Sequence, residues 1–442
     1  MQLAQDRFPA PDTGPATTEQ RPLRIALLGY RSHPHVGGQG IYLKYLSRAL
    51  VRRGHQVDVL SGPPYPELDP EVRLIRIPSL DLYAAMPNHI RALRWHHLKS
   101  FTDTFEWWSM ATGGFAEPYT FGRRVVRYLQ QHRGAYDIIH DNQSLCYGLL
   151  ELQKAGWPVV ATVHHPITRD RDLAVADAHS WGHRLLIRRW YSFLGMQQKV
   201  VRRLRHVVTV SECSRRDIAA EFGRSQHLTQ VIPNGVDTEL FQPQPQIERV
   251  PFRIMTTTSS DQPLKGFGVL LEALRRVRER LPEAHLLVIG KLQEGGRNQK
   301  LLKELGLEHC VTFRSGISDQ ELVEEYARAS VAVCPSLYEG FGLPAAEAMS
   351  CGVPLVSSNG GALAEVVGNA GVLVPAGDSE ALAKGICQVL SNRVLAQAMM
   401  QMGRQRITQE YCWDRVAERL TDFYHQIIPT LQSDSVAAGA NL

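Results

Sequence analysis

Two glutamates in the second half of the chain frame a short stretch that could bind an elongated ligand. Glu339 and Glu347 stand in EGFGLPAAE, with seven mostly small or apolar residues between them. Gly340 and Gly342 let the backbone approach a ligand closely, and Pro344 suits the first turn of a helix, whose free N–H groups would attract an anion. Glu339 would then lie in a loop and Glu347 in the helix, several ångströms apart. That separation suits contacts with the two ends of one elongated ligand better than a proton shared between the two carboxylates. The alternative is that Glu347 only favours the first helical turn and that Glu339 is a solvated loop residue.

Other candidate residues follow predicted strands or precede predicted helices. GGQG, from Gly37 to Gly40, comes after the first strand and opens a helix, although such a loop alone is more often only a tight turn. Lys265 in DQPLKGF precedes a helix, where a single lysine is usually solvated. His164 and His165 follow PVVATV, and no carboxylate or cysteine has the spacing that a metal site would need there.

These residues need strands to position them, and the chain alternates short apolar runs with helical patterns. Such runs are typical of strands buried on both faces of a parallel sheet, and their alternation with helices indicates βαβ units. One helix is predicted over 41–53, a second over 269–281, and a third begins near Asp319. Strands are predicted at 24–29, 55–61, 136–140, 158–163 and 206–211, and then at 252–258, 285–290, 310–313, 330–336 and 352–358.

A passage rich in Pro and Gln at about 235–250 separates the two series of strands. The pattern therefore predicts an α/β protein with two doubly wound, Rossmann-like domains. Ligands of such sheets bind at the carboxyl ends of the strands, so the natural site is the cleft between the domains. We predict a flexible segment over 1–21, domains over 22–235 and 236–410, a helix over 411–430 that packs back on the first domain, and a flexible tail over 431–442.

Composition excludes several classes of protein. A chain of 442 residues with a net charge of +5 is only mildly basic, so no nucleic-acid partner is expected. Seven cysteines without a CxxC pair argue against a disulfide framework or a structural zinc site. The first twenty residues lack the basic end and apolar run of a signal peptide, and no stretch approaches the roughly 18 apolar residues of a membrane span. We therefore expect a cytoplasmic protein.

Two further helical patterns carry alternatives. VSECSRRDIAAEFG could be part of a helix-turn-helix, with Ser214 and Asp217 as a capping box, but it follows a predicted buried strand and so indicates a helix of a Rossmann-like domain. The stretch between Asp177 and Glu212 holds seven Lys/Arg residues and no acid. Its apolar residues recur at helical spacing, which usually means a helix packed on the core. The alternative is a basic amphipathic helix that rests on an anionic membrane surface.

The stretch PSLYEGFGLPAAEAMSCGVPLVSSNGGALAEVVGNAGVLVPAGD resembles the family-4 retaining glycosyltransferases, in which the two glutamates form an E-x7-E motif. VSECSRRDI and VIPNGVDTELF are also similar to the inter-domain passage of that family, and the resemblance covers most of residues 23–425. It implies the GT-B fold and the transfer of a sugar from a nucleotide-diphosphate sugar to an acceptor hydroxyl. It also implies that the first domain binds the acceptor, that the second binds the donor, and that no metal or other cofactor is required.

The resemblance assigns roles to individual residues. Glu339 and His164 would contact the donor sugar during catalysis, and Glu347 would bind the ribose hydroxyls. The other implied donor-binding residues are Gly37, Gly38, Lys265, Gly340, Phe341, Gly342, Leu343 and, in the base-binding passage over 312–318, Arg314. The family pairs the lysine with an arginine a few residues earlier, both on the diphosphate. Ser260 occupies the arginine's position here, so Lys265, the helix start and nearby hydroxyls would have to hold the leaving group.

Acceptor recognition is predicted in the first domain. The stretch over 81–128 is rich in aromatic and basic residues, among them Trp107 and Trp108, whose ring faces could stack on sugars. The alternative is an extra helical pair whose aromatic residues fill its own core. His165 and Arg169, with Asp170, form a second candidate acceptor site.

The sequence does not identify the donor or the acceptor, so the donor could be a UDP-, GDP- or ADP-linked sugar. The reaction would belong to glycan, glycolipid or glycoconjugate biosynthesis. One alternative function is a nucleotide-sugar epimerase of the same architecture, which would need no acceptor. The other is a non-catalytic nucleotide-sugar-binding subunit, an option that Ser260 keeps open although Glu339, Glu347, Lys265 and His164 are all present.

Overall fold

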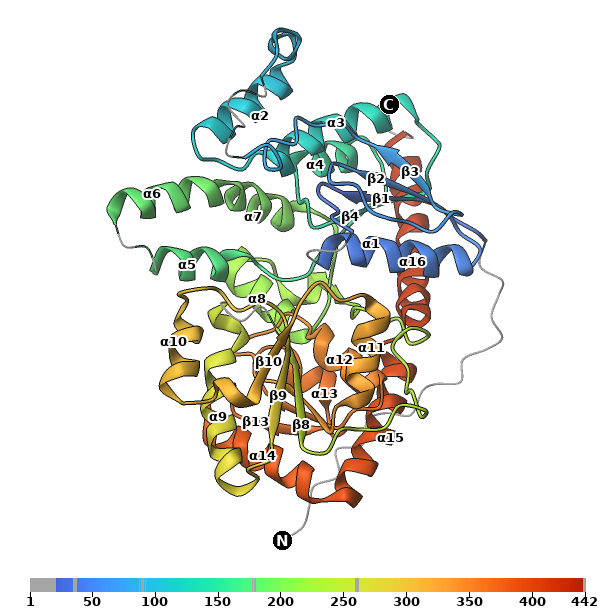
Figure 1. Cartoon of the computed structure of the whole chain (residues 1–442). Helices are drawn as coiled ribbons and strands as arrows, with labels where there is room; N and C mark the ends of the chain where they lie inside the picture. Colours follow the sequence, from blue (N-terminus) through green and yellow to red (C-terminus); the bar gives the residue numbers. More distant parts are fainter. Residues whose placement is uncertain are drawn as a thin grey trace.

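The computed structural model describes residues 21–34, 38–86, 88, 91, 93–176, 178, 180–258 and 262–439, without the side chains of 173 and 429–439. Within them the chain forms two parallel β-sheets with helices on both faces (Figure 1). One sheet comes from the first half of the chain and the other from the second half. The last helix returns to the first sheet.

The N-terminal domain contains seven strands in the order β3-β2-β1-β4-β5-β6-β7. The described pairings are all parallel. The strand order changes direction between β1 and β4, so a crevice opens at the carboxyl ends of these two strands. The strands are β1 (Arg24–Gly29), β2 (Gln56–Ser61), β3 (Arg73–Arg76), β4 (Ile138–Asn142), β5 (Val159–Val163), β6 (His206–Thr209) and β7 (Thr229–Val231).

Apolar helix faces bury both sides of this sheet. On one side α3 (Glu117–Gln131), α4 (Tyr147–Lys154), α7 (Leu194–Arg203) and α8 (Glu212–Phe222) pack against the strands. On the other side lie α1 (Gly38–Arg52) and the last helix, α16 (Trp413–Gly439), which runs past residue 430. The Tyr424 hydroxyl of α16 lies 2.5 Å from Nδ1 of His140 on β4, which ties the end of the chain to the first sheet.

Two helical segments project from this domain. One comprises η2 (Trp95–Lys99) and α2 (Phe101–Ala111), and the other comprises α5 (Thr168–Ala176), α6 (Trp181–Trp190) and η3 (Tyr191–Phe193) (Figure 1). The basic stretch after residue 177 therefore forms two helices with different surroundings. No residue of α6 is buried, whereas α7 buries Val200 and Val201 in the core.

The C-terminal domain repeats the same topology with six parallel strands in the order β10-β9-β8-β11-β12-β13. The strands are β8 (Arg253–Thr257), β9 (His285–Ile289), β10 (Val311–Arg314), β11 (Val331–Cys334), β12 (Leu355–Ser358) and β13 (Val372–Val374). Helices α9 (Phe267–Arg280), α10 (Arg297–Glu304) and α14 (Ser379–Ser391) pack on one face. Helices α11 (Asp319–Arg328), α12 (Leu343–Ser350), α13 (Leu363–Val367) and α15 (Arg393–Glu410) pack on the other. Short 3₁₀ turns are η4 (Gln226–Leu228), η5 (Pro263–Lys265) and η6 (Glu308–Cys310).

The predicted architecture of two Rossmann-like domains is confirmed. Each predicted strand is present, and β1 has the predicted bounds. The patterns missed β3, β7 and β13, which are only four, three and three residues long. Among the described residues, no helix is both long enough and apolar enough to span a bilayer.

Candidate active site

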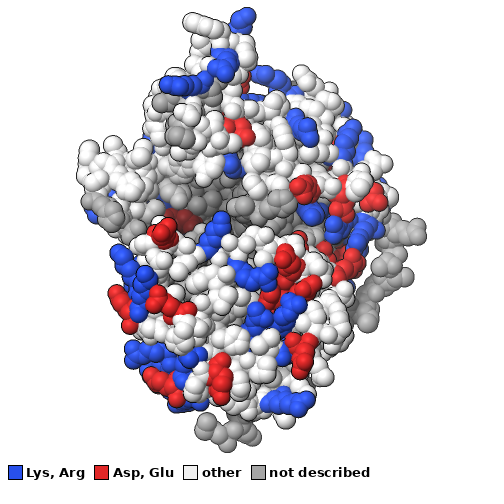
Figure 2. All heavy atoms as spheres, viewed as in Figure 1, with Lys and Arg blue, Asp and Glu red and all other residues white. Residues whose placement is uncertain are grey.

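A cleft of about 570 Å³ lies between the two domains, where the strand ends of both sheets meet. The space-filling view shows the surface hollowed between the upper and lower halves of the molecule (Figure 2). Residues from α1, the loops after β4 and β5, the inter-domain passage and the start of α12 line the cleft. Predicted site residues among them are Gly38, His164, His165, Lys265, Glu339, Gly340, Phe341, Gly342, Leu343 and Glu347.

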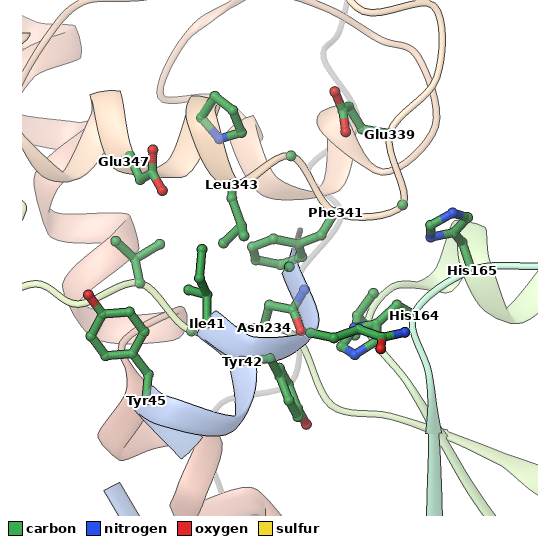
Figure 3. Close-up of a pocket in the computed structure, with 18 of the residues that line it drawn as sticks. Ile41, Tyr42, Tyr45, His164, His165, Asn234, Glu339, Phe341, Leu343 and Glu347 are labelled. Carbon is green, nitrogen blue, oxygen red and sulfur yellow. The ribbon is translucent and has the colours of Figure 1, made fainter. Parts of the chain in front are cut away.

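The two glutamates lie at opposite ends of the stretch that starts α12 (Figure 3). Gly342 caps this helix with a φ of 101°, a left-handed conformation that glycine adopts without strain, and Pro344 follows in the first turn. Phe341 and Leu343 lie between the two carboxylates, whereas His164 and His165 lie across the cleft (Figure 3). The predicted arrangement of strand, glycine loop and helix start is therefore present.

Glu339 is held by two donors. Nζ of Lys265 donates to its Oε1 at 2.8 Å, and the Ser336 hydroxyl donates to the same oxygen at 2.7 Å. The backbone of Glu339 packs against Gly361, where an added Cβ would come within 2.2 Å of the Glu339 carbonyl. Both the carboxylate and the backbone of Glu339 thus have defined positions.

Glu347 lies in a different environment. Burial, and then repulsion from Asp319, raises the pKa of Glu347 to about 7. The Tyr326 hydroxyl lies 3.5 Å from its Oε2 and 3.1 Å from the Thr257 hydroxyl. The carboxyl group of Glu347 therefore titrates close to neutral pH in the ligand-free protein.

His164 is neutral and its tautomer is determined by its neighbours. Burial lowers the pKa of His164 to about 3. Nδ2 of Asn142 donates to the Gln39 carbonyl at 3.1 Å, so Oδ1 of Asn142 accepts from Nε2 of His164 at 2.7 Å. The proton is on Nε2, which leaves Nδ1 as a hydrogen-bond acceptor.

Several predicted residues lie elsewhere. Gly37 and Ser260 are outside the described residues. Arg314 ends β10, but its guanidinium contacts Glu325 and Glu321, and the described lining of the cleft does not include it. Trp107 and Trp108 on α2 are also absent from that lining, and Arg189 lies over the Trp108 ring at 5.5 Å.

Arg169, predicted at the acceptor, takes part in a contact between the domains. It donates to Oδ1 of Asp217 on α8 at 2.8 Å, and its guanidinium carbon lies 4.2 Å from the centre of the Tyr338 ring. The Tyr338 hydroxyl donates to Oδ2 of Asp217 at 2.5 Å. The predicted capping box of Ser214 and Asp217 is wrong, because α8 begins one turn earlier with Ser211 as its N-cap and the Asp217 carboxylate is engaged by Arg169 and Tyr338.

Helix α8 of the first domain also holds the loop that carries Glu339. The Ser211 hydroxyl donates to the Gly340 carbonyl at 2.9 Å, and the Ser214 hydroxyl lies 3.3 Å from the same oxygen while it donates to the His164 carbonyl at 2.9 Å. In the opposite direction, the carboxylate of Glu365 in the second domain accepts from the backbone N–H groups of Glu212 and Cys213. The loop that carries Glu339 is therefore held by contacts from both domains.

Other residues of the cleft were not predicted from the sequence. Tyr45 lies across from Glu347 (Figure 3) and stacks on Trp413, with ring centres 6.0 Å apart. Oδ1 of Asn234 is buried without a partner among the described residues, which makes it a candidate acceptor for a ligand hydroxyl. Gln143 and Tyr191 also line the cleft. Asn142 and Gln143 could have been found as polar residues at the end of a predicted strand.

The cleft has little positive charge. Lys265 is the one Lys or Arg among its described lining residues. Residues 35–37 and 259–261, His-Val-Gly and Ser-Ser-Asp, are outside the described residues and contain no Lys or Arg. The surface outside the cleft carries interspersed acidic and basic side chains on the lower half of the molecule (Figure 2).

Comparisons with known proteins agree over most of the chain. Residues 36–240 match the family model described as Glycosyltransferase Family 4, and residues 242–406 match Glycosyl transferases group 1. An MMP α-(1→4)-mannosyltransferase of Mycolicibacterium hassiacum is 46% identical over 411 residues, which are 92% of this chain and 98% of the relative. A D-inositol 3-phosphate glycosyltransferase of Corynebacterium jeikeium is 26% identical over 436 residues, which are 92% of this chain and 97% of the relative.

Solved structures share the fold. A sucrose-phosphate synthase of Thermosynechococcus elongatus superposes with a TM-score of 0.66 at 24% identity, over 92% of this chain and 100% of its own. Anabaena HepE, solved in complex with UDP-glucose, superposes with a TM-score of 0.63 at 18% identity, over 93% of this chain and 100% of its own.

Proposed function

Because this chain belongs to glycosyltransferase family 4, we propose that it moves a mannosyl residue from a nucleotide-diphosphate sugar to a sugar hydroxyl, with retention of anomeric configuration. That the protein is a glycosyltransferase of the GT-B fold follows from the family itself. The sugar is inferred from the mannosyltransferase that is 46% identical, whose α-(1→4) linkage is what retention from an α-linked donor would produce. The observation that carries the proposal is the placement of Glu339 and Glu347 at the two ends of one cleft.

The donor would lie along the start of α12. Glu347 would accept hydrogen bonds from the ribose hydroxyls, and Glu339 would accept them from the transferred sugar. The diphosphate would then lie beside the N–H groups of the loop and first turn over 341–345, where the helix dipole favours an anion. HepE, which has the same fold and was solved in complex with UDP-glucose, supports a nucleotide-sugar donor, while the base bound by this chain stays open among uracil, guanine and adenine.

Breaking the anomeric bond builds positive charge on the sugar and negative charge on the departing diphosphate. Lys265 lies beside Glu339, so one cation could serve both the carboxylate and the leaving group. A lysine about 4 Å from a phosphate contributes roughly 4 kcal/mol at an effective dielectric of about 20. Preorganised amides supply the rest of the stabilisation, which is most effective where water is excluded.

Metal independence is part of the proposal. It is supported by the family resemblance and by the lysine and amide donors described above, which can stabilise the diphosphate themselves. Activity should therefore persist in excess EDTA. Loss of activity in EDTA that magnesium or manganese restores would contradict this part.

The acceptor and the location are also proposals. The acceptor role of Trp107 and Trp108 stays a prediction, and changing both to alanine should lower transfer more than donor hydrolysis. The cytoplasmic location rests on the sequence, and contact with an anionic membrane is supported by the basic helix α6, which exposes Trp181 and Leu185. Co-sedimentation with anionic vesicles, but not with neutral ones, would test the contact.

A screen of nucleotides tests the donor site before any acceptor is known. UDP, GDP and ADP would each be added to the full chain in a thermal-shift measurement. A nucleotide at 100 times its dissociation constant adds about 2.7 kcal/mol to the free energy of unfolding. One of the three should raise the melting temperature in the wild type and fail to do so in Glu347→Ala. No shift with any of them would count against a nucleotide-sugar donor.

A further inference from the structure

A second cavity of about 380 Å³ lies next to the cleft, between α5 and the junction of α6, η3 and α7. Figure 1 shows α5 running below α6 and α7 on the side of the N-terminal domain. The cavity is lined by Arg171, Asp172, Val175, Arg188, Tyr191, Ser192, Leu194 and Gly195. None of the residues to which the proposed donor site assigns a role belongs to it.

Tyr191 lines both this cavity and the cleft. Helix α5 forms the wall between them: Ile167 and Asp170, at and just before its first turn, face the cleft, whereas Asp172 and Val175 face the second cavity. The Tyr191 ring stacks on Phe193, with ring centres 6.2 Å apart at 30°. A chain that leaves the cleft beside Asp170 would therefore pass an aromatic ring held in place and enter the second cavity.

The lining of the second cavity suits an uncharged polyhydroxyl ligand. Arg171 is neutralised by Asp172 at 2.7 Å, so the pair offers both donors and acceptors without net charge. The Ser192 hydroxyl already accepts from Arg189 at 3.1 Å and can donate its proton elsewhere. Arg188 adds a single exposed cation, which is little for a polyphosphate. An aromatic face combined with such polar groups is the usual chemistry of sugar binding.

We propose that this second cavity is an acceptor subsite that binds the inner sugars of a glycan whose terminal residue lies in the cleft. The inference rests on the proposed mannosyl transfer and deepens it, because it makes the preferred acceptor an oligosaccharide rather than a single sugar. Tyr191 is the platform between the reacting residue and the sugars behind it. Arg188, Asp172 and Ser192 provide the hydrogen bonds of the subsite.

The test compares two acceptors with the full chain: methyl α-mannoside and the methyl glycoside of α-(1→4)-linked mannotetraose. The wild type should use the tetrasaccharide with a kcat/KM about tenfold higher or more, the factor expected for at least one hydrogen bond to a charged group. Arg188→Ala and Val175→Trp, which fills the cavity, should remove most of that preference. Arg184→Ala is the matched control, since Arg184 is an exposed arginine of the same helix outside the lining, and it should keep the preference.

Calorimetric binding of the tetrasaccharide provides a readout that needs no turnover. Its affinity should fall about tenfold in Arg188→Ala and stay within twofold in Arg184→Ala. The subsite is overturned if the wild type mannosylates both acceptors equally well, or if the two arginine variants behave alike. If neither acceptor is used while another sugar is transferred, the proposed mannosyl acceptor is wrong, and the subsite for this glycan is wrong with it.

Discussion

The guanidinium carbon of Arg169 lies 4.2 Å from the centre of the Tyr338 ring, and the two residues come from different domains. Both also bond to Asp217, so a cation, a phenol and a carboxylate join α5, α8 and the loop before Glu339. Tyr338 is the immediate neighbour of Glu339 in the chain. The contact between the two domains is thereby linked to the position of Glu339, which we propose binds the donor.

Asp217→Ala should weaken the contact between the domains without removing a residue of the proposed donor site. It removes the partner of both Arg169 and Tyr338, and loss of a hydrogen bond to a charged group costs about 1.5–3 kcal/mol, so kcat/KM for the donor should fall about tenfold or more. Tyr338→Phe should have a smaller effect in the same direction. The double variant should fall no further than Asp217→Ala alone. Fully additive losses in this double-mutant cycle would show that the two residues act independently.

Substitutions of Glu339 and of Glu347 should have different effects on the binding of a nucleoside diphosphate, which lacks the sugar. Glu347→Ala should raise the dissociation constant of the bound nucleoside diphosphate about tenfold, because ribose hydrogen bonds are lost. It should raise KM for the donor with little change in kcat, as expected for uniform binding loss. Glu339→Gln should bind the same nucleotide equally well or more tightly, since it frees Lys265, while kcat for transfer falls. Equal weakening by both variants would contradict the assignment of one carboxylate to each end.

Nucleotide binding should release a proton near neutral pH. The pKa of Glu347 is raised to about 7 in the free protein, and ribose hydroxyls that donate to it favour the ionised form, so the pKa falls on binding. Affinity should therefore decrease as the pH falls from 8 to 6. Calorimetry in buffers of different ionisation enthalpy would measure the proton, and Glu347→Gln should abolish its release. Proton uptake in the wild type would contradict the proposed contact.

The last helix should stabilise the first domain. Leu420 on α16 is fully buried against the first sheet, and large-to-alanine changes at such sites cost about 2–5 kcal/mol. Leu420→Ala should lower the midpoint of urea unfolding accordingly. Val394→Ala is a suitable control, because Val394 is 77% exposed and this substitution should change the free energy of unfolding by no more than about 0.5 kcal/mol. An equal effect of the two variants would mean that α16 contributes little.

The repeated apolar runs were sufficient to predict the fold, because strands of a parallel sheet are buried on both faces. β4 and β5 are buried throughout, and this is the pattern that predicted them. The strand β3 has four residues, none of them buried, and β7 and β13 have three residues each with mixed exposure, so their sequences carry no comparable signal. The likeness to family 4 covers most of the chain and is most specific in the second domain, where the motif is local in sequence.

The candidate site was predictable only where its residues stand close together in the chain. Glu339, Glu347 and the glycines between them form one motif, so their shared cleft could be expected. The Arg169–Asp217–Tyr338 contact joins residues far apart in sequence, and nothing in the local pattern around Asp217 distinguishes it from a helix-capping carboxylate. Tyr191 was likewise not predicted, since its role depends on two cavities that exist only in the folded chain.

Acceptor-dependent turnover of the donor tests the central claim most directly. The full chain would be incubated with UDP-, GDP- and ADP-mannose, with and without methyl α-mannoside or its tetrasaccharide, and both the free nucleotide and the sugar product would be quantified by NMR. The account predicts that one donor releases its nucleoside diphosphate in step with a new α-linked glycoside, and that omitting the acceptor stops nearly all of the release. Conversion of the donor to an epimer without an acceptor, formation of a β-linked product, or tight donor binding without any turnover would contradict it.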